Sequence, residues 1–440
     1  MTSWLLLLVA LAGALSTWNV YQPRYRPPWL ALFSFFAGWL TAELALHQIA
    51  VQLLIAAVLV AYGALSAWPG WLALPILVTG WLFLWRCHGN AHAAADAVER
   101  GLQLGLGVDY RSRIAPEAAE RFTIGINWRS LLIPLPRHPG VERVRDLTFS
   151  EGPGYRLRLD VYRHRDRPTR CPTLLQVHGG GWVLGSKNEQ GLPLMLHLAS
   201  QGWVCVSADY RLSPRATFPD PLVDLKQALR WIRQEGPAYG VDPDFVVVTG
   251  GSAGGHLAAL VALTANEPAY QPGFEDVDTS VRACVAFYGV YDFTDRHGIW
   301  PHGGLAKLLR KRVMKEALEE AREKYEQASP MSRVGTHAPP FFVIHGDRDT
   351  MVPVEEARRF SALLREAIPG QVVYAEIPGA QHAFEIFPSV RTMFVLQGVE
   401  RFLAWVYGQY LAERGTERSR ATPADARDSG GGLTAAARRL

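Results

Sequence analysis

Charged residues are almost absent from the beginning of the chain. Among Asp, Glu, Lys and Arg, residues 1–85 contain only Arg24, Arg26 and Glu43. The apolar segments of this region lie at about 4–20, 29–47, 49–67 and 71–85. Each approaches the roughly 17–25 residues that a helix needs to cross a bilayer, although the fourth is short. The pattern predicts a transmembrane region of three to four helices over residues 1–86.

Tryptophans stand near the ends of these segments, where indole rings favour the boundary between hydrocarbon and water. They are Trp4, Trp18, Trp29, Trp68, Trp71 and Trp85. The first segment could instead be a cleaved signal peptide, but no Lys or Arg precedes it and further apolar segments follow directly. Glu43 and His47 are either a functional ionisable pair or, the interpretation we favour, the interfacial end of a helix.

The orientation in the membrane rests on a few arginines. Arg24 and Arg26 favour a cytoplasmic first loop, whereas Arg86 and Arg100 favour the opposite assignment for the rest of the chain. Four spans with a cytoplasmic first loop would place the C-terminal part outside the cell. We therefore expect a multi-pass protein of the inner or plasma membrane with an extracytoplasmic catalytic domain.

Short apolar runs alternate with helical segments from about residue 141 onwards. The strand-like runs are Val141–Phe149, Leu157–Tyr162, Thr173–Val177, Val204–Ala208, Phe245–Thr249, Ala283–Tyr288, Phe341–Ile344 and Val372–Ile377. The first two can form a hairpin through Gly152-Pro153-Gly154. Apolar strands alternating with helices are typical of a mostly parallel sheet that helices cover on both faces. We expect an α/β fold with an eight-stranded sheet over residues 141–414.

The remaining stretches complete the predicted organisation. Residues 87–140 resemble a linker and cap segment, with a helical alanine-rich start followed by prolines. Residues 290–335 interrupt the alternation with an amphipathic helix over 305–321, and they form either a cap above the strand ends or a solvated surface helix. Residues 415–440 have no apolar face and predict a disordered tail. Ser186-x-x-Glu189 predicts a capping box for a helix over 188–201.

The overall composition excludes some classes of function. Hydrophobic residues make up 49% of the 440 positions, which excludes a disordered polymer. The net charge of +4 is small and scattered, which argues against a nucleic-acid-binding surface. The cysteines contain no C-x-x-C pair and indicate neither a zinc site nor a disulfide framework. They are Cys87, Cys171, Cys205 and Cys284.

A glycine-rich turn joins the apolar run 245–249 to a helical run. It reads Gly250-Gly251-Ser252-Ala253-Gly254. A G-x-S-x-G string between a strand and a helix is the context of a nucleophile elbow, in which a tight turn exposes the serine at the sheet edge. The alternative is a purely structural glycine turn. The context predicts Ser252 as a nucleophile.

A second glycine-rich segment follows the strand-like run 173–177. It reads His178-Gly179-Gly180-Gly181-Trp182. Consecutive glycines let backbone N–H groups face a single point, as the oxyanion of an acyl-transfer reaction requires. A phosphate-binding loop is the alternative, but neither the spacing nor a following Lys-Ser/Thr supports it.

A carboxylate and then a histidine follow the last two strand-like runs. The run 341–344 leads into Asp347 and Asp349, and the run 372–377 leads into His382. The resulting chain order of serine, acid and histidine is that of α/β-hydrolases. His382 would accept the Ser252 proton and return it to the leaving group, while the acid fixes the imidazole tautomer.

With these motifs the chain resembles the hormone-sensitive-lipase-like branch of α/β-hydrolases, which includes bacterial carboxylesterases with an N-terminal membrane anchor. The resemblance covers about 141–412 and also rests on Asp209-Tyr210-Arg211-Leu212-Ser213-Pro214 and Phe218-Pro219. It implies a triad of Ser252, Asp349 and His382. It also implies an oxyanion hole of Gly180, Gly181 and Ala253, with motif support from His178, Gly179, Gly250 and Gly254.

Two positions depart from that branch. The elbow carries Gly251 where many relatives have an acidic residue, and the acid loop is closer to that of peptidase-like relatives. Asp349 fits the family form His-Gly-x-x-Asp-x-x-Val, so we assign Asp347 to a hydrogen bond within the loop. These departures bear on the substrate class.

These features predict a membrane-anchored serine carboxylesterase that cleaves short- to medium-chain acyl esters through an acyl-enzyme on Ser252. The expected partners are a small acyl ester and the lipid bilayer, without nucleic acid, metal or cofactor. An amidase or acyltransferase with the same triad is the alternative within chemistry. A non-catalytic ligand-binding protein of this fold is the alternative from another class.

Overall fold

The centre of the molecule is the eight-stranded sheet that the apolar runs predict. Its strands are β1 (Val141–Gly152), β2 (Tyr155–His164), β3 (Cys171–Val177), β4 (Val204–Ala208), β5 (Val241–Gly251), β6 (Ala283–Phe287), β7 (Phe341–Gly346) and β8 (Val372–Ile377). They lie in the order β1-β2-β4-β3-β5-β6-β7-β8. Strand β2 is antiparallel to both neighbours, and β3 to β8 are parallel. The computed structural model describes residues 1–114, 128–133 and 136–421.

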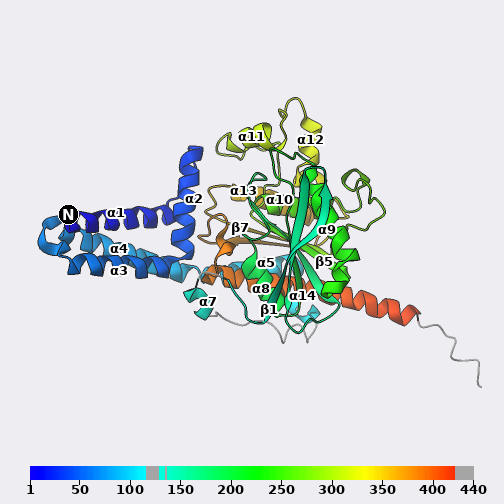
Figure 1. The fold of residues 1–440 in the computed structure, drawn as a ribbon, viewed down its shortest axis with the longest axis horizontal. Helices are drawn as coiled ribbons and strands as arrows, with labels where there is room; N and C mark the ends of the chain where they lie inside the picture. Colours follow the sequence, from blue (N-terminus) through cyan, green and yellow to red (C-terminus); the bar gives the residue numbers. More distant parts are fainter. Residues whose placement is uncertain (115–127, 134–135, 422–440) are drawn as a thin grey trace, which may run out of the picture.

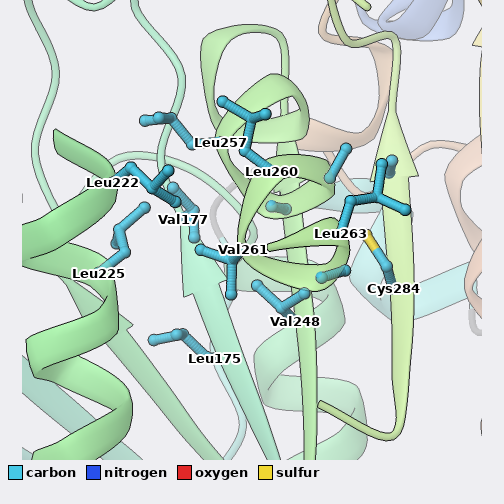
Figure 2. Close-up of a cluster of buried hydrophobic side chains, with 14 of the residues drawn as sticks. Leu175, Val177, Leu222, Leu225, Val248, Leu257, Leu260, Val261, Leu263 and Cys284 are labelled. Carbon is cyan, nitrogen blue, oxygen red and sulfur yellow. The ribbon is translucent and has the colours of Figure 1, made fainter. Parts of the chain in front are cut away.

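Helices cover both faces of the sheet, because side chains of each central strand alternate between two apolar cores. Leu175 of β3 belongs to one core and Leu174 to the other. The first core is closed by α9 (Asp220–Gln234), α10 (Ala253–Leu263) and α13 (Val354–Ala367). Figure 2 shows part of it, with side chains of α9 and α10 against β3 and β5. The second is closed by α5 (Ala93–Leu106), α8 (Leu192–Ser200) and α14 (Val390–Ala421). The predicted α/β-hydrolase fold is confirmed.

Helix α5 corrects the predicted linker over 87–140, because it belongs to the helical layer of the sheet domain. A Cβ at Gly101 would lie 2.6 Å from the carbonyl oxygen of Tyr374 in β8, and a Cβ at Gly105 would collide with the carbonyl oxygen of Val372 in the same strand. Glycine at both positions therefore allows α5 to lie directly on the edge strand. Beyond it, the structure describes the short helix α7 (Trp128–Leu132).

Three boundaries also differ from the prediction. Helix α14 continues through Ala421, so the domain does not end at 414, and the rest of the predicted tail lies outside the described residues. The cap helix expected over 305–321 is broken into α11 (Gly304–Leu308) and a π-turn (Leu309–Val313), and α12 (Arg322–Gln327) follows. The capping box is wrong, because the Ser186 hydroxyl binds the Glu189 side chain and α8 begins only after Gly191.

The N-terminal region consists of four helices, and three of them form a bundle. They are α1 (Thr2–Tyr21), α2 (Pro28–Glu43), α3 (Ala45–Ala61) and α4 (Trp68–Asn90). The rings of Trp4 and Trp68 meet at one end of the bundle, with centroids 5.4 Å apart, and those of Tyr21 and Phe83 meet near the other at 5.6 Å. Helices α1 and α4 therefore run parallel, and α3 runs in the opposite direction on the other side of α4 (Figure 1).

Helix α2 does not run along the axis of this bundle. It is bent by 89° from α3, and Figure 1 shows it standing across the near end of the bundle, against the sheet domain. Among the described residues, Thr2–Tyr21 and Trp68–Leu106 are long and apolar enough to cross a membrane, and the bent α2–α3 pair adds a third span if it counts as one. The segments predicted at 29–47 and 49–67 thus correspond to α2 and α3, and the sharp bend between them was not expected.

Candidate active site

Ser252 lies on the sharp turn between β5 and α10. Its backbone has φ 59° and ψ −122°, a conformation that side-chain-bearing residues rarely adopt. A Cβ at Gly250 would lie 2.7 Å from the carbonyl oxygen of Val177, and one at Gly254 would collide with the same atom. The two glycines thus let the turn pack directly onto the end of β3. The result is the strained strand-turn-helix geometry of a nucleophile elbow.

Backbone N–H groups without a partner among the described residues lie in the loop after β3 and at the start of α10. Gly180 and Gly181 have φ of 113° and 60°, so the loop after β3 adopts a path that favours glycine. The Gly179 N–H donates to Gln190 Oε1 at 2.6 Å. The N–H groups of Gly180, Gly181 and Ala253 have no acceptor among the described residues. These are the donors that an oxyanion hole requires.

Buried histidines hold the surroundings of this loop. The His178 ring stacks on Tyr210 with centroids 4.3 Å apart, and the Tyr210 hydroxyl donates to the His178 carbonyl oxygen at 3.0 Å. Trp182 Nε1 donates to His256 Nδ1 at 3.1 Å, and His256 Nε2 donates to the Ala328 carbonyl oxygen at 2.7 Å. Burial lowers the pKa of His256 to about 3, so its ring is neutral and structural.

Asp349 and His382 meet at the ends of β7 and β8. His382 Nδ1 lies 2.6 Å from Asp349 Oδ2, and the other carboxylate oxygen accepts the backbone N–H groups of Met351 and Val352, each at 2.8 Å. Burial alone would raise the pKa of Asp349. The charge of His382 and the hydrogen bonds from His345 and His382 outweigh burial and hold this pKa well below its usual range. Asp349 is therefore ionised and orients the imidazole.

The neighbouring carboxylate, Asp347, points elsewhere. Its Oδ1 accepts the N–H of Gly379 at 2.7 Å, which is the loop hydrogen bond expected of it. The structure thus places Asp349, and not Asp347, against His382. Among the described residues, no hydrogen bond joins the Ser252 hydroxyl to His382. Such contacts are often long in ligand-free enzymes and tighten when substrate binds.

Two further side chains contact Asp349 and His382, and the sequence did not indicate a role for either. His345 Nε2 lies 3.2 Å from Asp349 Oδ2. Gln381 Oε1 accepts the N–H of Thr350 at 2.7 Å and that of His382 at 2.9 Å. One amide thus links the acid loop to the histidine loop. In the sequence, only the closeness of His345 to Asp349 and of Gln381 to His382 could have indicated these contacts.

Helix α2 packs on these same two loops. The Phe35 ring meets the His382 ring edge-on with centroids 5.8 Å apart. A Cβ at Gly38 would lie 3.4 Å from the Gln381 amide nitrogen, and the Thr350 hydroxyl donates to the Ala31 carbonyl oxygen at 3.0 Å. The N-terminal region therefore forms one wall of the candidate site.

A buried ion pair fixes the C-terminal end of α2. The Glu43 carboxylate pairs with the Arg391 guanidinium of α14 and accepts a hydrogen bond from the Ser389 hydroxyl at 2.6 Å. The side chains of Glu43 and Arg391 are 0% and 1% exposed. The favoured interpretation of Glu43 as an interfacial helix end is thus replaced by a structural contact that joins residues 348 positions apart.

Comparisons with known proteins agree with this fold. The BD-FAE family profile matches residues 159–364. The chain is 39% identical over 423 residues to the probable carboxylic ester hydrolase LipM of Mycobacterium tuberculosis, a match that covers 91% of this chain and 93% of LipM. It is 45% identical to esterase LipQ of the same organism, over 65% of this chain and 69% of LipQ.

A solved structure shows the same fold. A truncated carbohydrate esterase from gut microbiota matches 60% of this chain and 99% of its own, with a TM-score of 0.50 and 20% identity. Together, the fold, the elbow and the relatives define an α/β-hydrolase. The chain belongs to the family of carboxylic ester hydrolases represented by LipM, and the predicted enzyme class is confirmed.

Proposed function

We propose that Ser252, His382 and Asp349 are the catalytic triad and that Gly180, Gly181 and Ala253 donate the oxyanion-hole hydrogen bonds. The observation that carries the proposal is the hydrogen bond of His382 to Asp349 at the sheet edge where the strained Ser252 turn also lies. The set of unengaged N–H groups beside this turn supports the oxyanion assignment.

The reaction then proceeds in two halves. The Ser252 Oγ bonds to the acyl carbon while its proton passes to His382 Nε2, and the oxyanion forms against the three N–H groups. The bond to the alcohol breaks, and the alcohol leaves with the proton from His382. Water, deprotonated by His382, then attacks the acyl-enzyme and releases the acid and the free serine. Asp349 keeps Nδ1 protonated throughout.

We propose short- to medium-chain acyl esters as the substrates and retain the placement in the hormone-sensitive-lipase-like branch that the motifs suggested. The curated relatives are named as esterases, which favours ester over amide hydrolysis and over acyl transfer. The presence of serine, acid, histidine and unengaged N–H groups together argues against a non-catalytic binding protein.

The test is hydrolysis of nitrophenyl esters from acetate to palmitate by the detergent-solubilised full chain, beside its Ser252→Ala variant. We expect turnover that Ser252→Ala abolishes, with the optimum at short to medium chains. Turnover that survives in Ser252→Ala would contradict the proposed nucleophile. A folded protein without turnover on any ester would favour the amidase or acyltransferase alternative.

We further propose that α1, α3 and α4 cross a membrane. Each approaches the roughly 17–25 residues that a span requires, α3 having 17. Three crossings put the N-terminus and the catalytic domain on opposite sides, so Arg24 and Arg26 join Arg86 on the catalytic side. The turn at 62–67 on the far side contains no Lys or Arg.

This distribution of arginines reverses the expected orientation. Because positive loops stay in the cytoplasm, we propose a cytoplasmic catalytic domain, in place of the extracytoplasmic one that four spans implied. Ser66 is exposed in the far turn. A Ser66→Cys variant should react with a membrane-impermeant thiol reagent on intact cells, whereas reaction only after lysis would contradict this orientation.

A further inference from the structure

Helix α2 has one covered face and one uncovered face. On the covered face, Ala31 and Glu43 lie against the catalytic domain, and Ala42 packs against α1 and α4. The opposite face carries large apolar side chains that nothing in the described structure covers. They are Trp29 (68% exposed), Leu32 (44%), Phe33 (72%), Phe36 (50%) and Leu40 (37%). A soluble surface rarely concentrates side chains of this size on one short helix.

The bundle beside α2 indicates what covers this face. Helices α1, α3 and α4 expose apolar side chains along their length, as spans facing lipid do. Since α2 is bent by 89° from α3, a membrane crossed by the bundle runs parallel to the axis of α2. Figure 1 shows α2 at the end of the bundle where the catalytic domain begins. The exposed face of α2 is therefore continuous with the lipid-facing surface at the membrane boundary.

The ends of α2 fit such a position. Arg24 and Arg26 directly precede the helix and are exposed, where they can meet lipid phosphates. Trp29 follows them, and amphipathic indole rings favour this depth. An amphipathic helix of this kind lies in the plane of the interface with its apolar face roughly 5–10 Å into the headgroup boundary.

The covered face of the same helix reaches the chemistry. Phe35 contacts His382, and Pro28 lies near Gly304 of the cap helix α11. Ser252, Gly180 and Gly181 are partly exposed, and the nearby Leu184 is 61% exposed. An exposed apolar side chain thus lies close to the glycine loop, and α2 lies beside His382.

We propose that α2 lies in the membrane interface and that the substrate passes along it from the bilayer to Ser252. The substrate class is an acyl ester of medium chain length that dissolves in lipid. This inference rests on the proposed function, because it assumes ester hydrolysis at Ser252. It makes the membrane region a part of substrate capture as well as an anchor.

The first test uses the full chain in vesicles of phosphatidylcholine and phosphatidylglycerol. In Trp29→Ser/Phe33→Ser, turnover of nitrophenyl laurate held in the vesicles should fall about tenfold, because the helix loses its apolar contact with lipid. Turnover of water-soluble nitrophenyl acetate should stay within about twofold. The matched control is Leu11→Ser/Leu15→Ser, which removes exposed apolar side chains at the same spacing from α1.

Unchanged laurate turnover, or an equal fall in the α1 control, would overturn the proposal. A second measurement reads the position of α2 without any catalysis. A fluorophore on Phe33→Cys should be quenched by a lipid nitroxide near the headgroup, and one on the exposed Glu151→Cys should not. Absence of quenching at position 33 would overturn the interfacial placement. Absence of ester turnover in the chain without the Trp29 and Phe33 substitutions, with quenching at position 33 intact, would overturn only the proposed function.

Discussion

The two halves of the candidate active site are built in different ways. The nucleophile half, around Ser252 and the glycines after β3, is held by contacts within residues 176–330, such as Gln190 on Gly179 and Trp182 on His256. The acid and base half, around Asp349 and His382, is also held from outside the sheet domain. Thr350 bonds to Ala31, and the Arg348 guanidinium bonds to the Val20 carbonyl oxygen.

This difference indicates that the N-terminal helices, besides forming the proposed membrane region, help to position Asp349 and His382. Changes in α2 should disturb the acid and the base while the elbow keeps its shape. Substitutions inside the sheet domain should disturb the elbow and leave α2 in place. The predictions below separate the two halves.

The largest effect is expected within the acid and base half itself. Asp349→Asn should lower kcat on nitrophenyl esters by about 10⁴, because the amide no longer enforces the required imidazole tautomer. Asp347→Asn serves as the matched control, since that carboxylate accepts only a backbone N–H from Gly379. An active Asp349→Asn beside an inactive Asp347→Asn would move the acid to Asp347.

The ion pair at the end of α2 should matter next. Glu43→Gln leaves the buried Arg391 guanidinium uncompensated, and such changes lower the free energy of unfolding by about 3–5 kcal/mol. Denaturant unfolding in detergent would measure it. The comparison variant is Glu151→Gln, whose pair with Arg156 is exposed and contributes about 0–1 kcal/mol. Equal losses from both variants would show that α2 is not anchored through Glu43.

A smaller effect is expected on the nucleophile side. A Cβ at Gly251 would lie 2.7 Å from the Tyr288 hydroxyl, so Gly251→Ala should lower the free energy of unfolding by about 1–3 kcal/mol through overpacking. The Cε2 and Cζ atoms of the same ring would lie 2.9 and 3.0 Å from that Cβ, and Phe retains both atoms. Tyr288→Phe should therefore restore only part of the stability that Gly251→Ala loses. A double variant no more stable than Gly251→Ala alone would contradict this packing.

Most of the sheet domain could be predicted from the sequence for a physical reason. Parallel strands buried on both faces are continuous apolar runs, so strands β3 to β8 were recognisable, and the antiparallel pair β1 and β2 was recognisable from the glycines of its hairpin turn. The elbow and the choice of Asp349 depend on residues adjacent in the chain. The bend between α2 and α3 could not be predicted. Both helices are apolar all round, and nothing local shows that Glu43 pairs with Arg391.

Other misses have the same origin. The alanine-rich start of 87–140 predicted a helical segment, but only tertiary contact shows that Gly101 and Gly105 place it on β8. The break after α11 comes from a π-turn, which an amphipathic pattern over 305–321 does not reveal. Local pattern therefore gives the elements, whereas their partners depend on residues far apart in the chain.

The most direct test of the account is the effect of α2 on a water-soluble ester, for which delivery from the membrane is irrelevant. A Leu side chain at Gly38 would press on Asn19 of α1 and on Gln381, which holds both Thr350 and His382, whereas Gly89→Leu adds the same side chain in α4 where no atom lies within 4 Å of a Cβ. We predict that kcat/KM for nitrophenyl acetate falls about tenfold in Gly38→Leu only, since small displacements of catalytic groups are costly. Wild-type activity in both variants would contradict the claim that α2 forms part of the catalytic site.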